Sequence, residues 1–324
     1  MLTPKNKKNT VADSAYLVFF TLWIWVTHPR IIAFFIRRIR YFPRVIFPKT
    51  INDKFIWRKI FDHDPRFVIL SDKLACKKWV SERIPELRIA KVLWAGNSTG
   101  NIPRELIGKP AILKANHGCG TNYFLNEANY DLRKLEEKAQ SWLRLNHGKD
   151  HGEWAYSQIR RKIFLEEIIE PKKDSLTELK IYTFGDKVGR IVHIGGRLGD
   201  IRSNAWNIDN DDNPVLSDEP ASLAKPDPNM PLPASFPAAL RIARKLGKEF
   251  DHLRVDLLYD GVDLWLGELT VYNQAGYMYI PSAQDPLSSL SKMWDIQKSG
   301  FFAYSGKQKR YRRYISILSK HLSS

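Results

Sequence analysis

The stretch Ala111–Tyr123 reads AILKANHGCGTNY, and it holds the most informative pattern in the chain. Its apolar start predicts a short strand over residues 111–114, and a loop containing Gly118 and Gly120 follows Lys114 at once. Glycines let backbone N–H groups turn toward a ligand, and a lysine at a strand end adds a fixed positive charge. The pattern is suited to a polyphosphate, although it is weak alone because many strand-to-loop junctions carry glycine.

The composition indicates a folded, strongly basic protein. Its 324 residues suffice for roughly two domains, and 44% apolar with 27% charged residues is typical of a globular chain. The net charge of +16 predicts attraction to nucleic acid, an anionic membrane surface or an acidic polymer. No recognised nucleic-acid-binding motif is present, so we expect no nucleic-acid partner. Only Cys76 and Cys119 carry thiols, which favours a reducing compartment without a disulfide framework.

Two apolar runs near the N-terminus are separated by His28, Pro29 and Arg30. Residues 15–26 read AYLVFFTLWIWV, which is shorter than the about 20 apolar residues of a membrane-spanning helix. No small-residue cleavage site follows, as a signal peptide would require. Residues 15–36 therefore form either an interfacial membrane anchor, which the tryptophans and basic flanks favour, or a helix packed on the main domain, with a true span least favoured.

The C-terminal run KQKRYRRYISILSKHL, residues 307–322, is also basic with one apolar side. It predicts either a solvated helix face or a second membrane-facing element. Two such ends on one chain favour the membrane surface somewhat.

The region between these ends has the pattern of an α+β domain. Ser71 and Asp72 are typical of a helix start, and Gly185-Asp186 is typical of a hairpin turn. The Asn-, Asp- and Pro-rich segment 205–235 predicts a long surface loop. Further helices are predicted over residues 131–145 and 236–250, and strands over residues 162–169, 178–184, 188–194, 253–259 and 264–270.

Two acidic residues, Asp256 and Glu268, lie in successive predicted strands among apolar neighbours. They face each other only if the connection is longer than a two-residue turn, so we predict a loop over roughly residues 260–264. Facing buried carboxylates repel unless a cation lies between them or one is protonated. One interpretation is Mg²⁺ held by carboxylates and substrate phosphates. The other is two acids on a half-exposed sheet face, each paired with Arg or Lys.

These segments together resemble the ATP-grasp superfamily, and more closely the TupA-like ATP-grasp proteins of bacterial polysaccharide gene clusters. The resemblance covers roughly residues 48–281. It implies an ATP-grasp fold, in which two α+β subdomains clasp ATP, preceded by a helical N-terminal region. Six segments carry it in the family's order: PKTINDKFIWRKIFDHDPRF, SDKLACKKWV, ILKANHGCGTN, FLEEII, ELKIYTFGDKV, and HLRVDLLYDGVDLWLGELT with the Ala275-Gly276 that follow.

Composition and resemblance together divide the chain into four expected segments. A basic, apolar segment, residues 1–47, precedes a helical region, residues 48–110, that leads into the fold. The nucleotide-binding and catalytic domain covers residues 111–290, and a basic helical tail covers residues 291–324.

The resemblance also assigns ATP-binding roles to individual residues. Lys73 and Lys114 would contact the phosphates of ATP. The loop closing over the γ-phosphate would consist of Gly118, Cys119, Gly120 and Thr121. The adenine edge would be held by Glu166, Glu167, Ile168 and Ile169, although Glu166 and Glu167 could also be surface acids, and strand alternation allows only one of them to face inward.

The catalytic and metal-binding roles fall on the paired strands. By resemblance, Asp256 and Glu268 would hold Mg²⁺, Arg254 would steady the transferred phosphoryl group, and Lys180 would reach phosphate or substrate. The family often has Asn two residues after the metal-binding Glu, whereas this chain has Thr270, so water would fill the third metal position.

Two arginines of the segment GGRLGDIRSN, Arg197 and Arg202, carry guanidinium forks that fit a carboxylate. They either recognise an acidic substrate or are ordinary loop charges.

The resemblance implies an ATP-dependent carboxylate–amine ligase that forms a carbon–nitrogen bond through an acyl phosphate. Its partners would be ATP, Mg²⁺, an acidic glycan or lipid-linked glycan precursor, and an amine such as an amino acid. The product would serve capsule or exopolysaccharide synthesis, in the bacterial cytoplasm or on the inner face of the membrane. A sugar kinase and a non-catalytic polyanion- or membrane-binding protein are the alternatives.

Overall fold

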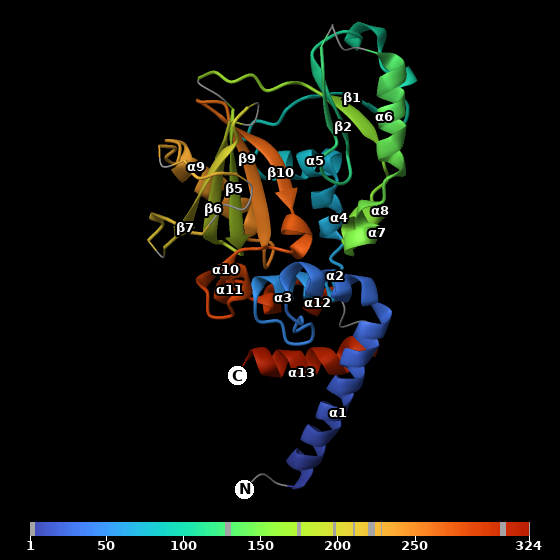
Figure 1. Cartoon of the computed structure of the whole chain (residues 1–324), viewed down its shortest axis with the longest axis vertical. Coiled ribbons are helices and arrows are strands. Elements are labelled where there is room, and N and C mark those ends of the chain that lie inside the picture. Colours follow the sequence, from blue (N-terminus) through green and yellow to red (C-terminus); the bar gives the residue numbers. More distant parts are fainter. Residues whose placement is uncertain are drawn as a thin grey trace. The chain divides into compact units, whose positions relative to one another are not determined.

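The computed structural model describes residues 4–126, 131–173, 176–196, 199–209, 211–219, 224–227, 229–304 and 309–323. The chain forms two compact units (Figure 1). One unit contains residues 65–271, and the other joins the two ends of the chain, residues 1–64 and 272–324. The units therefore combine segments that a division along the sequence would separate.

A six-stranded antiparallel sheet forms one part of the 65–271 unit, with the strand order β10-β9-β5-β6-β7-β8. The helix α9 (Phe236–Gly247) buries Leu240, Ala243 and Leu246, spaced three residues apart as one face of a helix requires. The hairpin predicted at Gly185-Asp186 joins β5 to β6. The strands are β5 (Thr177–Phe184), β6 (Lys187–Gly195), β7 (Arg202–Ile208), β8 (Pro214–Leu216), β9 (Leu253–Tyr259) and β10 (Leu264–Thr270).

A four-stranded antiparallel sheet forms the other part, with the order β1-β4-β2-β3. The helix α6 (Leu132–Arg144) lies along this sheet (Figure 1) and buries Leu135, Ala139 and Trp142 in one apolar cluster with strand residues such as Leu113 and Leu165. The strands are β1 (Val92–Gly96), β2 (Ala111–Ala115), β3 (Asn122–Leu125) and β4 (Ile163–Glu166).

Short helices of the same unit connect the sheets. Asp72 caps α5 (Lys73–Arg83) as predicted, because its carboxylate accepts a hydrogen bond from Leu74 N at 2.9 Å. The N–H of Lys73 donates to Asn116 O at 2.8 Å, which ties the start of α5 to the end of β2. The remaining helices are α4 (Arg66–Ser71), α7 (His147–His151) and α8 (Trp154–Gln158).

The second unit is helical and has an aromatic core. Trp57 on α3 (Ile51–Phe61) is fully buried and donates a hydrogen bond to Tyr314 OH at 2.9 Å. Phe61 and Phe301 pack against the same tyrosine. The other helices are α1 (Pro4–Thr27), α2 (Pro29–Ile39), α10 (Pro281–Gln284), α11 (Ser289–Met293), α12 (Gly300–Tyr304) and α13 (Arg312–Leu322).

Within the described ranges, no individual helix has the length and apolarity to cross a bilayer. The helices α1 and α2 have the required length and apolarity only when they are taken together, and the angle between them is 89°.

The prediction of one long loop over residues 205–235 is wrong in its first part. Strand β7 pairs with β6 and continues to Ile208, and β8 then pairs with β7. Polar residues obscured the strand because their hydrogen bonds are supplied by tertiary contacts. Asn204, for example, is buried and donates from its side chain to Met230 O at 3.0 Å. Burial on a sheet therefore overrode local composition.

Candidate active site

The strand-and-loop motif of residues 111–123 adopts the predicted conformation. Lys114 lies on β2, opposite Phe164 of β4 and Asn122 of β3. Gly118 has φ +74° and Gly120 has φ +71°, which are left-handed conformations that favour glycine. The ammonium of Lys73 donates to the carbonyl of Gly118. This bond holds the loop against the start of α5.

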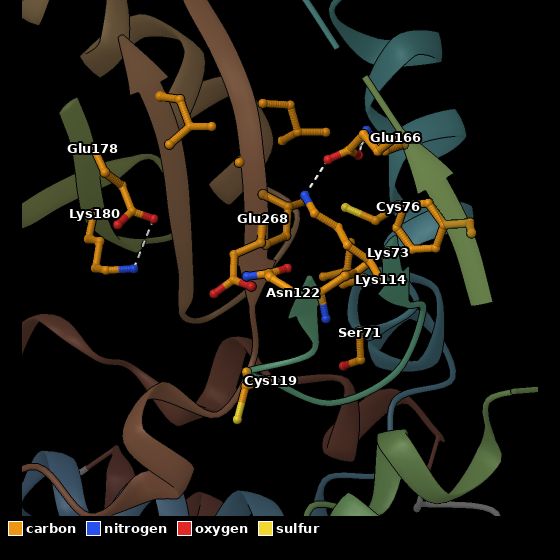
Figure 2. A pocket seen from close by; sticks show the side chains of 18 of the residues that line it. Ser71, Lys73, Cys76, Lys114, Cys119, Asn122, Glu166, Glu178, Lys180 and Glu268 are labelled. Carbon is orange, nitrogen blue, oxygen red and sulfur yellow. Dashed lines mark hydrogen bonds and ion pairs between the residues drawn. The ribbon is translucent and has the colours of Figure 1, made fainter. Parts of the chain in front are cut away.

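Residues from both sheets and from α5 surround a cavity of about 260 Å³ (Figure 2). Figure 2 shows Glu178 and Lys180 on one side, Lys73 and Lys114 on the other, and Glu268 between them. Cys119 and Gly120 line the cavity from the loop. The structure thus brings the predicted phosphate-binding lysines and one predicted metal ligand together. Its charged lining residues are Lys73, Lys77, Lys114, Glu166, Glu178, Lys180 and Glu268.

Glu166 is buried at the end of β4 and is held by two lysines. The ammonium of Lys77 lies 2.6 Å from Glu166 Oε2, and Lys114 contacts Oε1. Burial raises the pKa of Glu166, but the two lysines outweigh it and lower the pKa below its usual range. Glu167 instead accepts a hydrogen bond from Lys91 N at 2.7 Å. Of the two, only Glu166 lines the first cavity.

Lys77 was missed by the sequence reasoning. It follows Lys73 by one turn of α5, so both ammonium groups lie on the same helix face. That four-residue spacing, beside a predicted phosphate-binding lysine, was the available signal. Burial lowers the pKa of Lys73, and the nearby Lys114 lowers it further, while Glu268 raises it. Three lysines close together favour an anion between them.

Asp256 and Glu268 are partners on β9 and β10, as predicted, but the register arises differently. Leu264 pairs with Tyr259 directly across a short connection, residues 260–263. The ladder then shifts at Gly267, an extra residue between Leu266 and Glu268. A Cβ at position 267 would lie 2.9 Å from Asp256 O, so the bulge requires glycine.

Asp256 is fully buried between two cations. Its oxygens lie 2.7 Å from Lys180 Nζ, 2.7 Å from Arg254 Nε and 2.7 Å from Arg254 Nη2. Burial would raise the pKa of this carboxyl, yet Arg254 and Lys180 lower it to about 2. Arg254 Nη2 also donates to Glu268 at 3.1 Å and to Thr270 Oγ1 at 3.0 Å. Both acids are therefore paired with basic side chains, as the second interpretation of the sequence expected.

Of the two carboxylates, Glu268 lines the cavity and is the donor that fits Mg²⁺ there. No group of three or more His, Cys, Asp or Glu side chains suited to a metal occurs in the ranges that the structure covers. Magnesium at nucleotide sites, however, takes one or two carboxylates and completes its shell with phosphate oxygens and water. Asp256 is not among the lining residues, and its oxygens are already bonded to Lys180 and Arg254. Thr270, at the position of the usual Asn, donates its hydroxyl to Glu268 at 3.2 Å.

A second cavity, of about 420 Å³, adjoins the first and is mostly apolar. The two share the side chains of Lys114, Asn122, Glu166 and Leu258. A size of this order, with apolar walls, suits a flat ring system. All four residues predicted to hold adenine, 166–169, line this second cavity. Their role stays a prediction.

Some predicted site residues lie away from the two cavities. Arg254 is buried and is not among the residues lining either cavity, but it contacts Glu268, which lines the first one. Arg202 forms an ion pair with Asp200 and belongs to the lining of neither cavity. Arg197 lies outside the described residues.

The family model described as TupA-like ATPgrasp matches residues 53–287. Among proteins of curated function, none matches the chain. The solved structure of the ATP-grasp ligase PsnB with a minimal precursor is 14% identical, with a TM-score of 0.39 over 72% of this chain and 62% of that protein. The D-alanine–D-alanine ligase of Bacillus anthracis is 16% identical, with a TM-score of 0.34 over 78% of this chain and 69% of that protein. Such distant likenesses do not identify a substrate.

Proposed function

Because the chain belongs to the TupA-like ATP-grasp family, we propose that it is a ligase that joins a carboxylate to an amine at the expense of ATP. The carboxylate would belong to a cell-surface polysaccharide or its precursor, and the amine to a small molecule such as an amino acid. The ATP-grasp fold expected from the sequence is confirmed by the family match. The substrates are the part that this proposal adds.

The proposal rests on a polar, lysine-lined cavity that lies next to an apolar one. Three lysines from two elements, Lys73, Lys77 and Lys114, line a polar cavity that also contains Glu268. An apolar cavity adjoins it directly. A nucleotide needs this pair of environments, because its base is apolar and flat while its triphosphate is highly charged. The glycine loop of residues 118–121 borders the polar part and would cover the γ-phosphate.

The chemistry needs positioning and charge neutralisation rather than a nucleophilic side chain. A carboxylate oxygen would attack the γ-phosphorus, the bond to the β-phosphate oxygen would break, and ADP would leave. The amine would then attack the acyl carbon and release phosphate, with loss of one proton. Burial raises the pKa of the Cys119 thiol, so this cavity cysteine is held in its weakly nucleophilic form.

The protein's own residues would act at each stage. The lysines would bind the phosphates, and the loop around Gly118 and Gly120 would exclude water from the acyl phosphate. Arg254 would orient Glu268, because it donates a hydrogen bond to that carboxylate. Mg²⁺ would be held by Glu268 and would neutralise phosphate charge when bound.

The glycan part of the proposal draws on the family resemblance and on charge. An acidic glycan would be attracted to a chain of net charge +16. A uronic acid supplies both the negative charge and the carboxylate to be activated.

The test is a crossed substrate screen with the purified chain, ATP and Mg²⁺. Uronic-acid sugars are combined with amino acids, and ADP release is measured for each single substrate and each pair. We expect ADP release that needs both a carboxylate and an amine, with free phosphate as coproduct. A carboxylate labelled with ¹⁸O should transfer one labelled oxygen to that phosphate.

The same screen distinguishes the alternatives. Phosphate that stays on the sugar, with no need for an amine, would replace the ligase by a kinase. ATP binding without turnover on any pair, together with normal cellular function of a variant that cannot bind ATP, would indicate a non-catalytic protein.

A further inference from the structure

The first helix, α1, has two apolar sides with different surroundings. On one side, Phe20 and Ile24 are 8% and 0% exposed. Phe20 stacks on Phe61 of α3 and also packs against Tyr314 of α13. Asp13 fixes the same side by an ion pair with Arg313, whose atoms lie 2.9 Å apart. This side seats α1 in the helical unit, so α1 has a defined orientation there.

The other side of α1 lies in solvent. We define it as the outer face, which consists of Val11, Val18, Phe19, Leu22 and Val26. These side chains are between 57% and 78% exposed. Most are spaced by three, four or seven residues, so they form one continuous stripe on the helix. Single exposed apolar residues are ordinary, but a contiguous stripe marks an interaction surface.

The C-terminal helix α13 shows that this exposure is not a general property of basic ends. Its apolar residues Tyr314 and Leu318 are both fully buried in the helical unit. Its other apolar residues, Ile315, Ile317 and Leu322, are half-buried, and its exposed residues, such as Arg312 and Lys320, are polar or charged. Of the two basic, apolar ends of the chain, the N-terminal one alone presents an apolar face among the residues that the structure covers.

The segment that follows Asp13, which contains all the outer-face residues except Val11, is free of acid. No Asp or Glu occurs between Asp13 and Asp53. Exposed arginines follow directly on α2, at Arg30, Arg37 and Arg38. Because this charge has one sign only, two copies of the segment would repel each other. An apolar stripe beside unbalanced positive charge is complementary to an anionic lipid surface, which offers hydrocarbon and negative headgroups together.

We propose that the outer face of α1 docks the protein on an anionic bilayer, with α1 lying in the interfacial plane and the arginines of α2 at the headgroups. A span is disfavoured, because α1 and α2 are bent by 89° and the inner side of α1 is occupied by α3 and α13. The inference does not depend on the proposed ligase function. It resolves the two interpretations of residues 15–36, since one helix packs and presents a membrane face at once.

The test is vesicle flotation of the full chain. Vesicles are made of phosphatidylcholine alone or of phosphatidylcholine with phosphatidylglycerol. We expect binding to the anionic vesicles that is weakened by salt and by loss of the anionic lipid. The double variant Val18→Asp/Leu22→Asp should lower that binding at least about tenfold, since two apolar contacts are lost.

The matched control is Val215→Asp/Leu216→Asp on strand β8. It makes the same chemical change at side chains of equal exposure, 55% and 59% against 60% and 57%. It should bind vesicles nearly as the unaltered chain does, apart from a small effect of net charge. Thermal melting of both pairs checks that they fold, and Arg37→Gln/Arg38→Gln, which leaves the outer face intact, should weaken binding about fivefold for each arginine.

Three outcomes would overturn the proposal. The first is an unaltered chain that does not float with anionic vesicles. The second is an equal loss of binding in the two Asp pairs, which would show a mere effect of charge. The third is a dimer, seen by light scattering, that Val18→Asp/Leu22→Asp dissociates, because the outer face would then be an interface between copies of this chain.

Discussion

The basic and acidic walls of the polar cavity differ in how far their charged side chains are already paired within the protein. On the wall formed by α5 and β2, Lys77 and Lys114 share the single carboxylate of Glu166, and Lys73 donates to the carbonyl of Gly118. On the wall formed by β9 and β10, Asp256 is already saturated by Arg254 and Lys180. The basic wall therefore has excess positive charge that can bind an anionic ligand. The negative charge of Asp256 on the acidic wall is instead balanced by side chains of the protein. The residue type alone does not show whether a charged side chain is paired within the protein or available to a ligand.

The largest effect on this comparison should come from Asp256→Asn. Removing one charge from a buried ionic cluster leaves Arg254 and Lys180 poorly compensated, and such losses cost about 3–5 kcal/mol. Denaturant unfolding should show this loss of stability. The matched variant Glu268→Gln, at a half-exposed carboxylate, should cost less than about 1 kcal/mol. If Asp256→Asn were as stable as the unaltered chain, the claim that Asp256 balances the buried charges of Arg254 and Lys180 would be wrong.

The next effect should come from Lys114→Ala. A lysine that contacts phosphate contributes about 2–3 kcal/mol to binding, so ATP affinity measured by calorimetry should fall about 30- to 100-fold. Stability should fall less than in Asp256→Asn, because Lys77 still pairs with the buried Glu166. Lys109→Ala, an exposed lysine just before the same strand, serves as the control. Unchanged ATP affinity in Lys114→Ala would remove the basic wall from the nucleotide site.

The acidic wall should also show a characteristic acid sensitivity. The folded pKa of Asp256, about 2, lies below the usual value of about 3.9. A carboxyl with a lowered pKa stabilises the fold above its unfolded pKa, and this contribution disappears as the pH falls toward the folded pKa. Unfolding free energies should therefore lose on the order of 2 kcal/mol between about pH 5 and pH 2 through this residue. Asp256→Asn should lack that part of the drop, and an identical pH profile would contradict the assignment.

The smallest effect should come from Thr270→Val. The threonine hydroxyl accepts a bond from Arg254 and donates one to Glu268, so its loss should cost about 1 kcal/mol in denaturant unfolding. Ser at this position keeps the hydroxyl and should restore stability. A variant Thr270→Val that is as stable as Thr270→Ser would show that the hydroxyl bonds contribute nothing.

Much of the fold could be predicted because local patterns and tertiary context agree. The cap at Asp72 and the hairpin turn at Gly185 are each specified by nearby residues, and the structure confirms both. The strand β7 was missed because its polar residues satisfy their hydrogen bonds through distant backbone groups. A pattern along the sequence cannot show such partners.

The candidate site was predicted in its residue types more than in its contacts. The resemblance assigned Lys73, Lys114 and Glu268 to one nucleotide site, and the three side chains line one cavity, while their roles stay a prediction. Lys77 was overlooked because a lysine within a polar helix is usually a solvated one. The pairing of Asp256 by Lys180 depends on the alignment of β5 with β9, which a single sequence does not specify.

The bulge at Gly267 has a consequence for how such sites arise. In an unbroken ladder, Glu268 would stand opposite Val255, and its carboxylate would point to the reverse side of the sheet from Asp256. One unpaired glycine thus determines whether the two carboxylates lie on the same side of the sheet. Two hairpins with the same acids and the same turn could have unlike chemistry, and the difference would rest on a residue that carries no functional group.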